Sequence, residues 1–276
     1  MLTIVIGRAK TGKSTFCFRQ FAKKICAGGD VPSYFIVPEQ FALSAERQIL
    51  HLPEMEGRTL FGDEVLSFKR LSHRILNQLG GLGLEHIDES GRIMMLTRAA
   101  YELKDQLSYY TNLSERPWQI VQILSLISEF EKYGVNHKVL EQLLQNDSMT
   151  TTLRAKLNDL ALLYALYSEH LHEKSITESD LFQLAVRKAS AAHYFRDASV
   201  WVDSFTGFTA LERDYLSLML RECASVTVTL CMDERNEPIF DGIRSTYALL
   251  VKLAKEQRVP FKVIDITNHS GRFSFY

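Results

Sequence analysis

Hydrophobic positions follow two different periods along this chain. Short apolar runs rich in β-branched residues predict strands, and longer stretches with apolar residues three or four positions apart predict helices. The expected strands are residues 2–6, 34–37, 59–61, 199–202, 226–230 and 261–266. The expected helices between them are residues 13–27, 39–50, 65–79, 211–223 and 247–255.

Between about residues 88 and 196 the helical period continues with no convincing strand. Helices are expected there at residues 93–107, 118–133, 139–144, 153–172 and 181–190. Thr177 and Asp180 have the spacing of a helix start, because the threonine oxygen can accept an early N–H and the acid favours the positive end of the helix dipole. Thr209 and Glu212 have the same spacing before the helix at 211–223.

Strands separated by helices indicate a parallel sheet with right-handed crossovers and helices on both faces. We therefore predict an α/β fold with a large helical insertion. Residues 1–86 and 197–276 are expected to form a discontinuous nucleotide-binding domain, and residues 87–196 the inserted helical subdomain. The chain stops soon after its last strand with no closing helix, a pattern typical of a fragment of a longer protein.

Composition narrows the classes of function. Of the 276 residues, 32 are Lys or Arg and 33 are Asp or Glu, so the net charge of -1 indicates no overall preference for nucleic acid, although a local patch stays possible. The longest apolar run is too short for a bilayer and the amino-terminal run lacks a signal peptide's basic flank, so we expect a cytoplasmic protein with no membrane contact. Absent metal or disulfide spacing favours buried, reduced thiols at Cys17, Cys26, Cys223 and Cys231.

The strongest chemical signal lies between the first strand and the first helix. Residues 7–14 fit G-x-x-x-x-G-K-[ST], the phosphate-binding loop or P-loop, in the strand-to-helix context that this motif requires. Backbone N–H groups and the helix dipole would hold phosphate oxygens, Lys13 would reach the β- and γ-phosphates, and Ser14 would bind Mg²⁺. For ATP and Mg²⁺ as cofactors, the predicted nucleotide-binding residues are Gly7, Arg8, Ala9, Lys10, Thr11, Gly12, Lys13, Ser14 and Thr15.

A second magnesium ligand is expected at the end of another strand. Asp203 directly follows the strand at 199–202, but the next residue is Ser204 rather than the glutamate that often orients the attacking water. The sequence therefore predicts metal binding by Ser14 and Asp203 with slow ATP hydrolysis. The alternative for Asp203 is a capping residue at a strand-to-loop corner.

A basic group lies on the predicted third helix. Lys69, Arg70, His73 and Arg74 follow Phe68, and Arg70 and Arg74 are one turn apart. On a nucleic-acid protein this group would contact phosphates, with the aromatic ring available for stacking on a base. The alternative is an ordinary solvated basic face. We take Phe68, Lys69, Arg70 and Arg74 as candidate DNA-binding residues.

Longer motifs resemble the amino-terminal region of one protein family. Together with the loop they are F-I-V-P-E-Q-F at residues 35–41 with Glu46, V-L-S-F-K-R-L at 65–71, Gly80-Gly81, and V-D-S-F-T-G-F-T at 202–209. In these segments the chain resembles the AddB/RexB family of ATP-dependent helicase/deoxyribonuclease subunits. The specific part is V-P-E-Q and D-S-F-T-G-F, and the residues that match position by position include Gly7, Gly12, Lys13, Ser14 and Asp203.

The resemblance implies a P-loop NTPase fold of the RecA-like, superfamily 1 helicase type, covering about the first quarter of such a protein. It also implies a bacterial machine that, with an AddA-type partner subunit, resects double-strand breaks for homologous recombination. In that family the AddB protein is not the main motor, and its nuclease and iron–sulfur cluster lie outside this chain. We therefore expect an ATP-binding, DNA-contacting helicase-like domain with little or no ATPase, helicase or nuclease activity of its own.

Two other classes stay open from the residues. A small-molecule or nucleoside kinase also combines a P-loop with a helical lid, but such a lid is usually rich in arginines, whereas the inserted block here is apolar and mixed in charge. The third class is an interaction module whose loop holds nucleotide only for stability.

Overall fold

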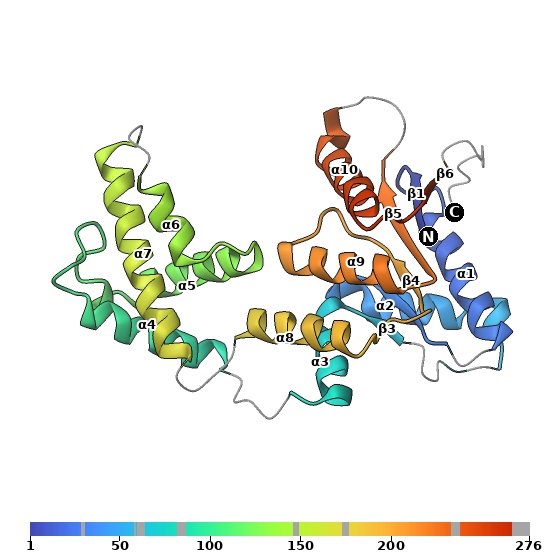
Figure 1. Ribbon diagram of the computed structural model, residues 1–276, viewed down its shortest axis with the longest axis horizontal. Coiled ribbons are helices and arrows are strands. Elements are labelled where there is room, and N and C mark those ends of the chain that lie inside the picture. The colour runs from blue at the N-terminus through green and yellow to red at the C-terminus, as the bar shows by residue number, and fades with distance from the viewer. Residues whose placement is uncertain are drawn as a thin grey trace. The chain divides into compact units, whose positions relative to one another are not determined.

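The strands form one sheet in which every neighbouring pair is parallel. The computed structural model describes residues 1–28, 31–57, 59, 64–81, 87–145, 149–172, 177–232 and 238–266. Its strands are β1 (Leu2–Gly7), β2 (Ser33–Ile36), β3 (Glu64–Leu66), β4 (Ser199–Val202), β5 (Ser225–Cys231) and β6 (Phe261–Asp265). They lie in the order β3-β2-β4-β5-β1-β6 (Figure 1). The predicted α/β fold with a parallel sheet is confirmed.

Ten α-helices lie in the described part of the chain. They are α1 (Lys13–Ala27), α2 (Ala42–Leu50), α3 (Phe68–Leu79), α4 (Glu89–Glu102), α5 (Pro117–Lys132), α6 (His137–Leu143), α7 (Thr151–His172), α8 (Glu178–Ala191), α9 (Ala210–Glu222) and α10 (Asp241–Glu256). None of these helices has both the length and the apolar character that a membrane span requires.

The chain divides into two compact units. The sheet unit comprises Met1–Leu79, Ala185–Phe208 and Glu212–Tyr276, and the helical unit comprises Gly80–Leu184 and Thr209–Leu211. Residues 185–196, which the sequence assigned to the helical subdomain, group with the sheet in this division.

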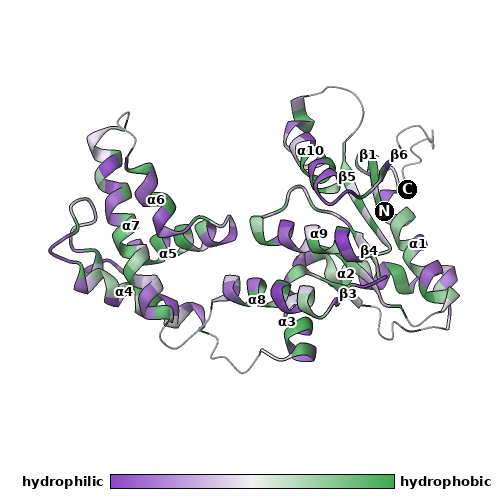
Figure 2. Ribbon diagram, viewed as in Figure 1, coloured by the Kyte–Doolittle hydropathy of each residue, from purple (hydrophilic) through white to green (hydrophobic). Residues whose placement is uncertain are grey.

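Both faces of the sheet are apolar, as a parallel sheet covered by helices requires. On one face, the ring of Phe21 in α1 lies edge-on to Phe35 at 5.4 Å and to Trp201 at 5.3 Å between ring centroids. On the opposite face, Tyr34 contacts Phe195 edge-on at 5.7 Å. Hydrophobic residues accordingly follow the strands of the sheet (Figure 2).

The helix predicted at residues 65–79 is wrong at its start. Residues Glu64–Leu66 form β3, which pairs with β2, and α3 begins only at Phe68. The Ser67 hydroxyl marks the boundary, because it accepts the backbone N–H of Arg70 at 3.2 Å in the manner of a helix cap. Pairing with a distant strand therefore overrides a local helical period. Of the strand expected at residues 59–61, Leu60 and Phe61 lie outside the described residues, and Thr59 belongs to no strand.

The helical unit has an apolar core of its own. Helix α7 packs against α4 and α6, and α5 packs against α4. Fully buried Asp159 of α7 accepts backbone N–H groups from Ser108 at 3.2 Å, Tyr109 at 2.7 Å and Tyr110 at 2.9 Å. These bonds attach the connection after α4 to α7, so a buried carboxylate is satisfied by backbone alone.

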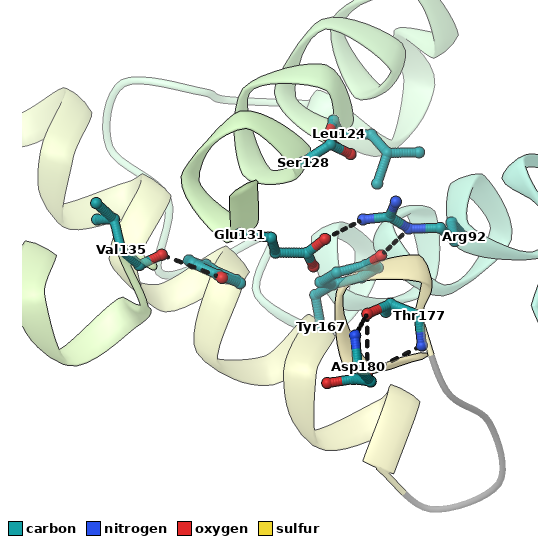
Figure 3. Close-up of polar contacts among 9 residues, drawn as sticks. Arg92, Leu124, Ser128, Glu131, Val135, Tyr167, Thr177 and Asp180 are labelled. Atoms are coloured by element: carbon teal, nitrogen blue, oxygen red, sulfur yellow. Dashed lines mark hydrogen bonds and ion pairs between the residues drawn. The ribbon is translucent and has the colours of Figure 1, made fainter. Parts of the chain in front are cut away.

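A largely buried ion pair joins α4 and α5 (Figure 3). Arg92 donates to Glu131 Oε2 at 3.0 Å and to the Tyr167 hydroxyl at 2.6 Å, and the side chains of Arg92 and Glu131 are only 14% and 12% exposed. Burial raises the pKa of Glu131, although the positive charge of Arg92 opposes this shift. Burial also raises the pKa of Tyr167 to about 12. The pair thus depends on both partners being present.

The predicted start of α8 is confirmed in the same view (Figure 3). The Thr177 hydroxyl oxygen accepts the backbone N–H of Asp180 at 3.2 Å, and the Asp180 carboxylate accepts the backbone N–H of Thr177 at 2.9 Å. Two N–H groups at the helix start are thereby satisfied reciprocally, as in a capping box.

Replacing Arg92 by methionine should destabilise the helical unit by about 3–5 kcal/mol, because the buried Glu131 carboxylate would lose its cation. Urea denaturation followed by circular dichroism measures this loss. The matched control is Arg98→Met on the same helix. Arg98 pairs with exposed Glu102 at 2.8 Å, and water screens such a pair, so little stability should be lost.

The loss in Arg92→Met should also depend on pH. Because burial raises the pKa of Glu131, the folded chain keeps this proton to a higher pH than the unfolded chain, and stability falls as pH rises from the unfolded pKa through the folded one. Removing Arg92 raises the folded pKa further and widens that window. The variant should therefore lose less stability at about pH 5 than at about pH 8, and equal losses would contradict the buried-charge explanation.

Candidate functional site

The loop between β1 and α1 has a backbone that its glycines permit. Gly12, directly before α1, has a φ of 91°, in the left-handed region that favours glycine. A Cβ atom added to Gly7 would lie 2.5 Å from Thr11 Oγ1 and 3.3 Å from Lys13 Cγ. The loop therefore closes tightly over Gly7, and a larger residue would displace it.

Within the loop, donors converge on the Arg8 carbonyl oxygen. It accepts from the Thr11 backbone N–H at 3.3 Å, from the Thr11 hydroxyl at 2.9 Å and from Lys13 Nζ at 2.6 Å. Burial lowers the pKa of the Lys13 ammonium, while the nearby Cys231 and Asp203 side chains act in the opposite direction. Lys13 is therefore a partly desolvated cation held at the mouth of the loop.

Asp203 lies where β4 ends, in the same region as Lys13. Its side chain is 3% exposed, and its backbone N–H continues the ladder to the Ile36 carbonyl oxygen at 2.9 Å. The Thr229 hydroxyl donates a short hydrogen bond to Asp203 Oδ1, and the Ser204 hydroxyl donates to Oδ2 at 3.1 Å. The carboxylate is thus buried, engaged at both oxygens and electrostatically coupled to Lys13.

The remaining loop residues differ in exposure. Arg8, Ala9, Lys10 and Thr15 are exposed, whereas Ser14 in the first turn of α1 is half-buried. The structure therefore brings the two predicted charged residues, Lys13 and Asp203, into one neighbourhood at the carboxyl ends of the strands.

The cysteines are only partly as expected. All four lie in the described part of the chain and form no disulfide there, and Cys17 and Cys223 are buried. Cys231, however, is exposed at the end of β5, in register with Gly7 of β1. The expectation of burial is wrong for this residue because β5 ends beside the loop rather than beneath a helix.

The basic group on α3 does not present all its members in the same way. Phe68 is 2% exposed and packs against the rings of Phe205 at 5.5 Å and Tyr215 at 5.7 Å, so its ring is not available to a base in this packing. Arg74 is half-buried with its guanidinium 5.7 Å from the centre of the Tyr34 ring. Lys69, Arg70 and His73 form the exposed part of the group.

Sequence reasoning missed Thr229. Its hydrogen bond to Asp203 joins two strands that are not consecutive along the chain. The available signal was the alternation of Thr227 and Thr229 along an otherwise apolar buried strand, which places two hydroxyls on one face of the sheet.

Comparison with known proteins identifies relatives along nearly the whole chain. The family model described as "ADDB, N-terminal" matches residues 4–275. A protein of Thermoanaerobacter sp. (strain X514) is 33% identical over 271 residues, which is 96% of this chain and 23% of that protein. One from Acetivibrio thermocellus is 30% identical over 279 residues, which is 99% of this chain and 24% of that protein.

A Clostridium perfringens protein is 32% identical over 265 residues, 94% of this chain and 23% of that protein. All three relatives are named as the B-type component of an ATP-dependent helicase/deoxyribonuclease. The chain spans about a quarter of the length of the curated relatives it matches. The resemblance seen in the motifs is confirmed: this chain belongs to the family of AddB amino-terminal regions.

Proposed function

We propose that this chain binds ATP with Mg²⁺ at the carboxyl edge of its sheet, as a P-loop domain of the RecA-like, superfamily 1 helicase type. The observation that carries the proposal is the pairing of a strand–loop–helix, bearing Lys13, with a buried Asp203 at the end of another parallel strand. A parallel sheet presents ligand sites at this edge.

The donor set fits a magnesium nucleotide. Backbone N–H groups of residues 8–15 and the start of α1 suit phosphate oxygens, and the close approach over Gly7 leaves room for the loop but not for a side chain. Lys13 would neutralise the β- and γ-phosphates. Ser14 and Asp203 offer a hydroxyl and a carboxylate, which are ligands that Mg²⁺ prefers.

The longer relatives suggest the setting in which this site works. We place the chain in a bacterial, cytoplasmic helicase–nuclease complex with an AddA-type partner subunit, acting on DNA in double-strand break repair by homologous recombination. Family membership supports this role. The same membership favours it over a small-molecule or nucleoside kinase and over a pure interaction module.

The domain is proposed to bind ATP without being a motor. Ser204 follows Asp203, and its hydroxyl is bonded to the Asp203 carboxylate at 3.1 Å. A serine cannot act as the carboxylate base that orients an attacking water. Nucleotide would therefore stabilise this domain or regulate its complex rather than drive movement.

Lys13→Ala should weaken ATP–Mg²⁺ affinity at least about tenfold, equivalent to about 1.4 kcal/mol, because a charge-assisted contact to phosphate is lost. Isothermal titration calorimetry measures the change. The control is Lys23→Ala, an exposed lysine farther along the same helix, which should bind as the parent does. Equal affinities for the parent and Lys13→Ala would contradict the site.

The chain should hydrolyse ATP at less than about 1 s⁻¹ with or without DNA, which is the low end of ordinary enzymes. The reason is the missing acid after Asp203. Phosphate release is the measurement, and the rate of Lys13→Ala gives the background. A faster turnover that disappears in Lys13→Ala would overturn the non-motor proposal.

Weak, salt-sensitive binding of single-stranded DNA should depend on the exposed cations of α3. The double variant Lys69→Glu with Arg70→Glu should remove binding that is micromolar or weaker at low salt and that fades between about 50 and 200 mM salt. Fluorescence anisotropy of a labelled oligonucleotide measures it. Arg74 is left unchanged because its guanidinium packs over Tyr34 and its loss would affect stability.

The matched control reverses the same number of charges elsewhere in the sheet unit. Lys23→Glu with Lys24→Glu on α1 exchanges two exposed, adjacent lysines. It should weaken binding only through net charge, by much less than the α3 variant. Equal losses in the two double variants would show that the α3 group has no specific role.

A further inference from the structure

Two hydroxyl groups hold the buried carboxylate of Asp203. Thr229 Oγ1 donates to Oδ1, and Ser204 Oγ donates to Oδ2 at 3.1 Å. Thr229 is itself 3% exposed, so its hydroxyl exchanges little with water. An aspartate has a broad terminal torsion when nothing restrains it, and here both oxygens are restrained.

The direction of the threonine bond follows from a third contact. The backbone N–H of Ser204 donates to Thr229 Oγ1 at 3.4 Å. A hydroxyl has one proton to donate, and with a lone pair engaged by this N–H the Thr229 proton is directed to Asp203. The chain of bonds therefore runs from the Ser204 backbone through Thr229 to the carboxylate.

The backbone at Ser204 supports this arrangement at a cost. Ser204 has a φ of 67°, in the left-handed region that non-glycine residues seldom adopt. Such a conformation costs on the order of 1 kcal/mol and persists where its surroundings require it, often at functional sites. In this one, the Ser204 N–H meets Thr229 while its hydroxyl turns back to Asp203.

Thr229 also stands between the two halves of the candidate site. Strand β5 lies between β4, which ends at Asp203, and β1, which leads into the loop. In the parallel register Thr229 is level with Val5 of β1, two residues before Gly7. A side chain at this position is placed to set Asp203 relative to the loop.

We propose that Thr229 is a positioning residue, whose hydroxyl orients the Asp203 carboxylate toward the magnesium ion of bound nucleotide. The inference rests on the proposed nucleotide site. Partners that orient a metal-binding side chain typically change metal affinity 10- to 100-fold when they are removed. Loss of the Thr229 hydroxyl should accordingly reduce the effect of Mg²⁺ on ATP binding, while binding of metal-free ATP stays the same.

The experiment compares ATP affinity in Mg²⁺ with ATP affinity in EDTA, using a fluorescent ATP analogue and the whole 276-residue chain. Thr229→Val removes the hydroxyl with almost no change in shape, and Thr229→Ser restores it. The control is Thr227→Val on the same strand and face, where the side chain is 6% exposed. Thermal denaturation checks that each variant is folded.

We expect Mg²⁺ to strengthen binding by the parent, Thr229→Ser and Thr227→Val to a similar degree, and to strengthen binding by Thr229→Val at least tenfold less. An unchanged magnesium effect in Thr229→Val would overturn the inference. If Thr229→Val does not fold, Thr229→Ala replaces it under the same criterion. A parent that binds nucleotide no better than Lys13→Ala would overturn the proposed nucleotide site itself, whereas a parent that binds without any magnesium effect would overturn only the role of Thr229.

Discussion

Because all strands of the sheet run in one direction, their carboxyl ends must meet at one edge. Gly7 and the loop follow β1, Asp203 follows β4, and Thr229 lies near the end of β5 between them. These residues are far apart along the chain, and only the parallel arrangement brings them together. The proposed chemistry of the chain is therefore a consequence of strand direction before it is a consequence of any single side chain.

Buried charge is handled differently in the two units. In the helical unit, Glu131 is balanced by Arg92, while Asp159 relies on backbone N–H groups. In the sheet unit, Asp203 has two hydroxyl donors and a partly desolvated Lys13 nearby. Hydroxyls neutralise no charge, so Asp203 retains an attraction for a cation that Glu131 has already satisfied. This contrast separates a carboxylate that stabilises a core from one suited to a metal.

Much of the fold follows from local patterns in the sequence. The strands around Ile4, Val200 and Val228 and the helix that starts at Lys13 were predicted close to their observed bounds, because each has a clear period and clear breakers. The loop and Asp203 were identified as candidates for the same reason. Strand β3 was not, since Val65 and Leu66 continue a helical period and only pairing with β2 makes them a strand.

The side chains that were misjudged share one cause. Phe68 stands next to Lys69 and Arg70, but adjacency along a helix does not say which side faces the core, and Phe68 packs against Phe205 and Tyr215. Thr229 was missed because its hydrogen bond crosses strands. Contacts between distant segments decide both cases, and no local period carries that information.

The order of the strands has a consequence for how the protein is made. β1 and β2 are synthesised first, yet β4 and β5 separate them in the sheet, and both come after the helical unit. During translation β1 has no neighbour to pair with until about two hundred further residues have emerged. Its apolar surface must wait unpaired, a state in which folding is slow and chains associate readily. The loop is complete only when β5 arrives, so nucleotide can select only those chains in which this late step has succeeded.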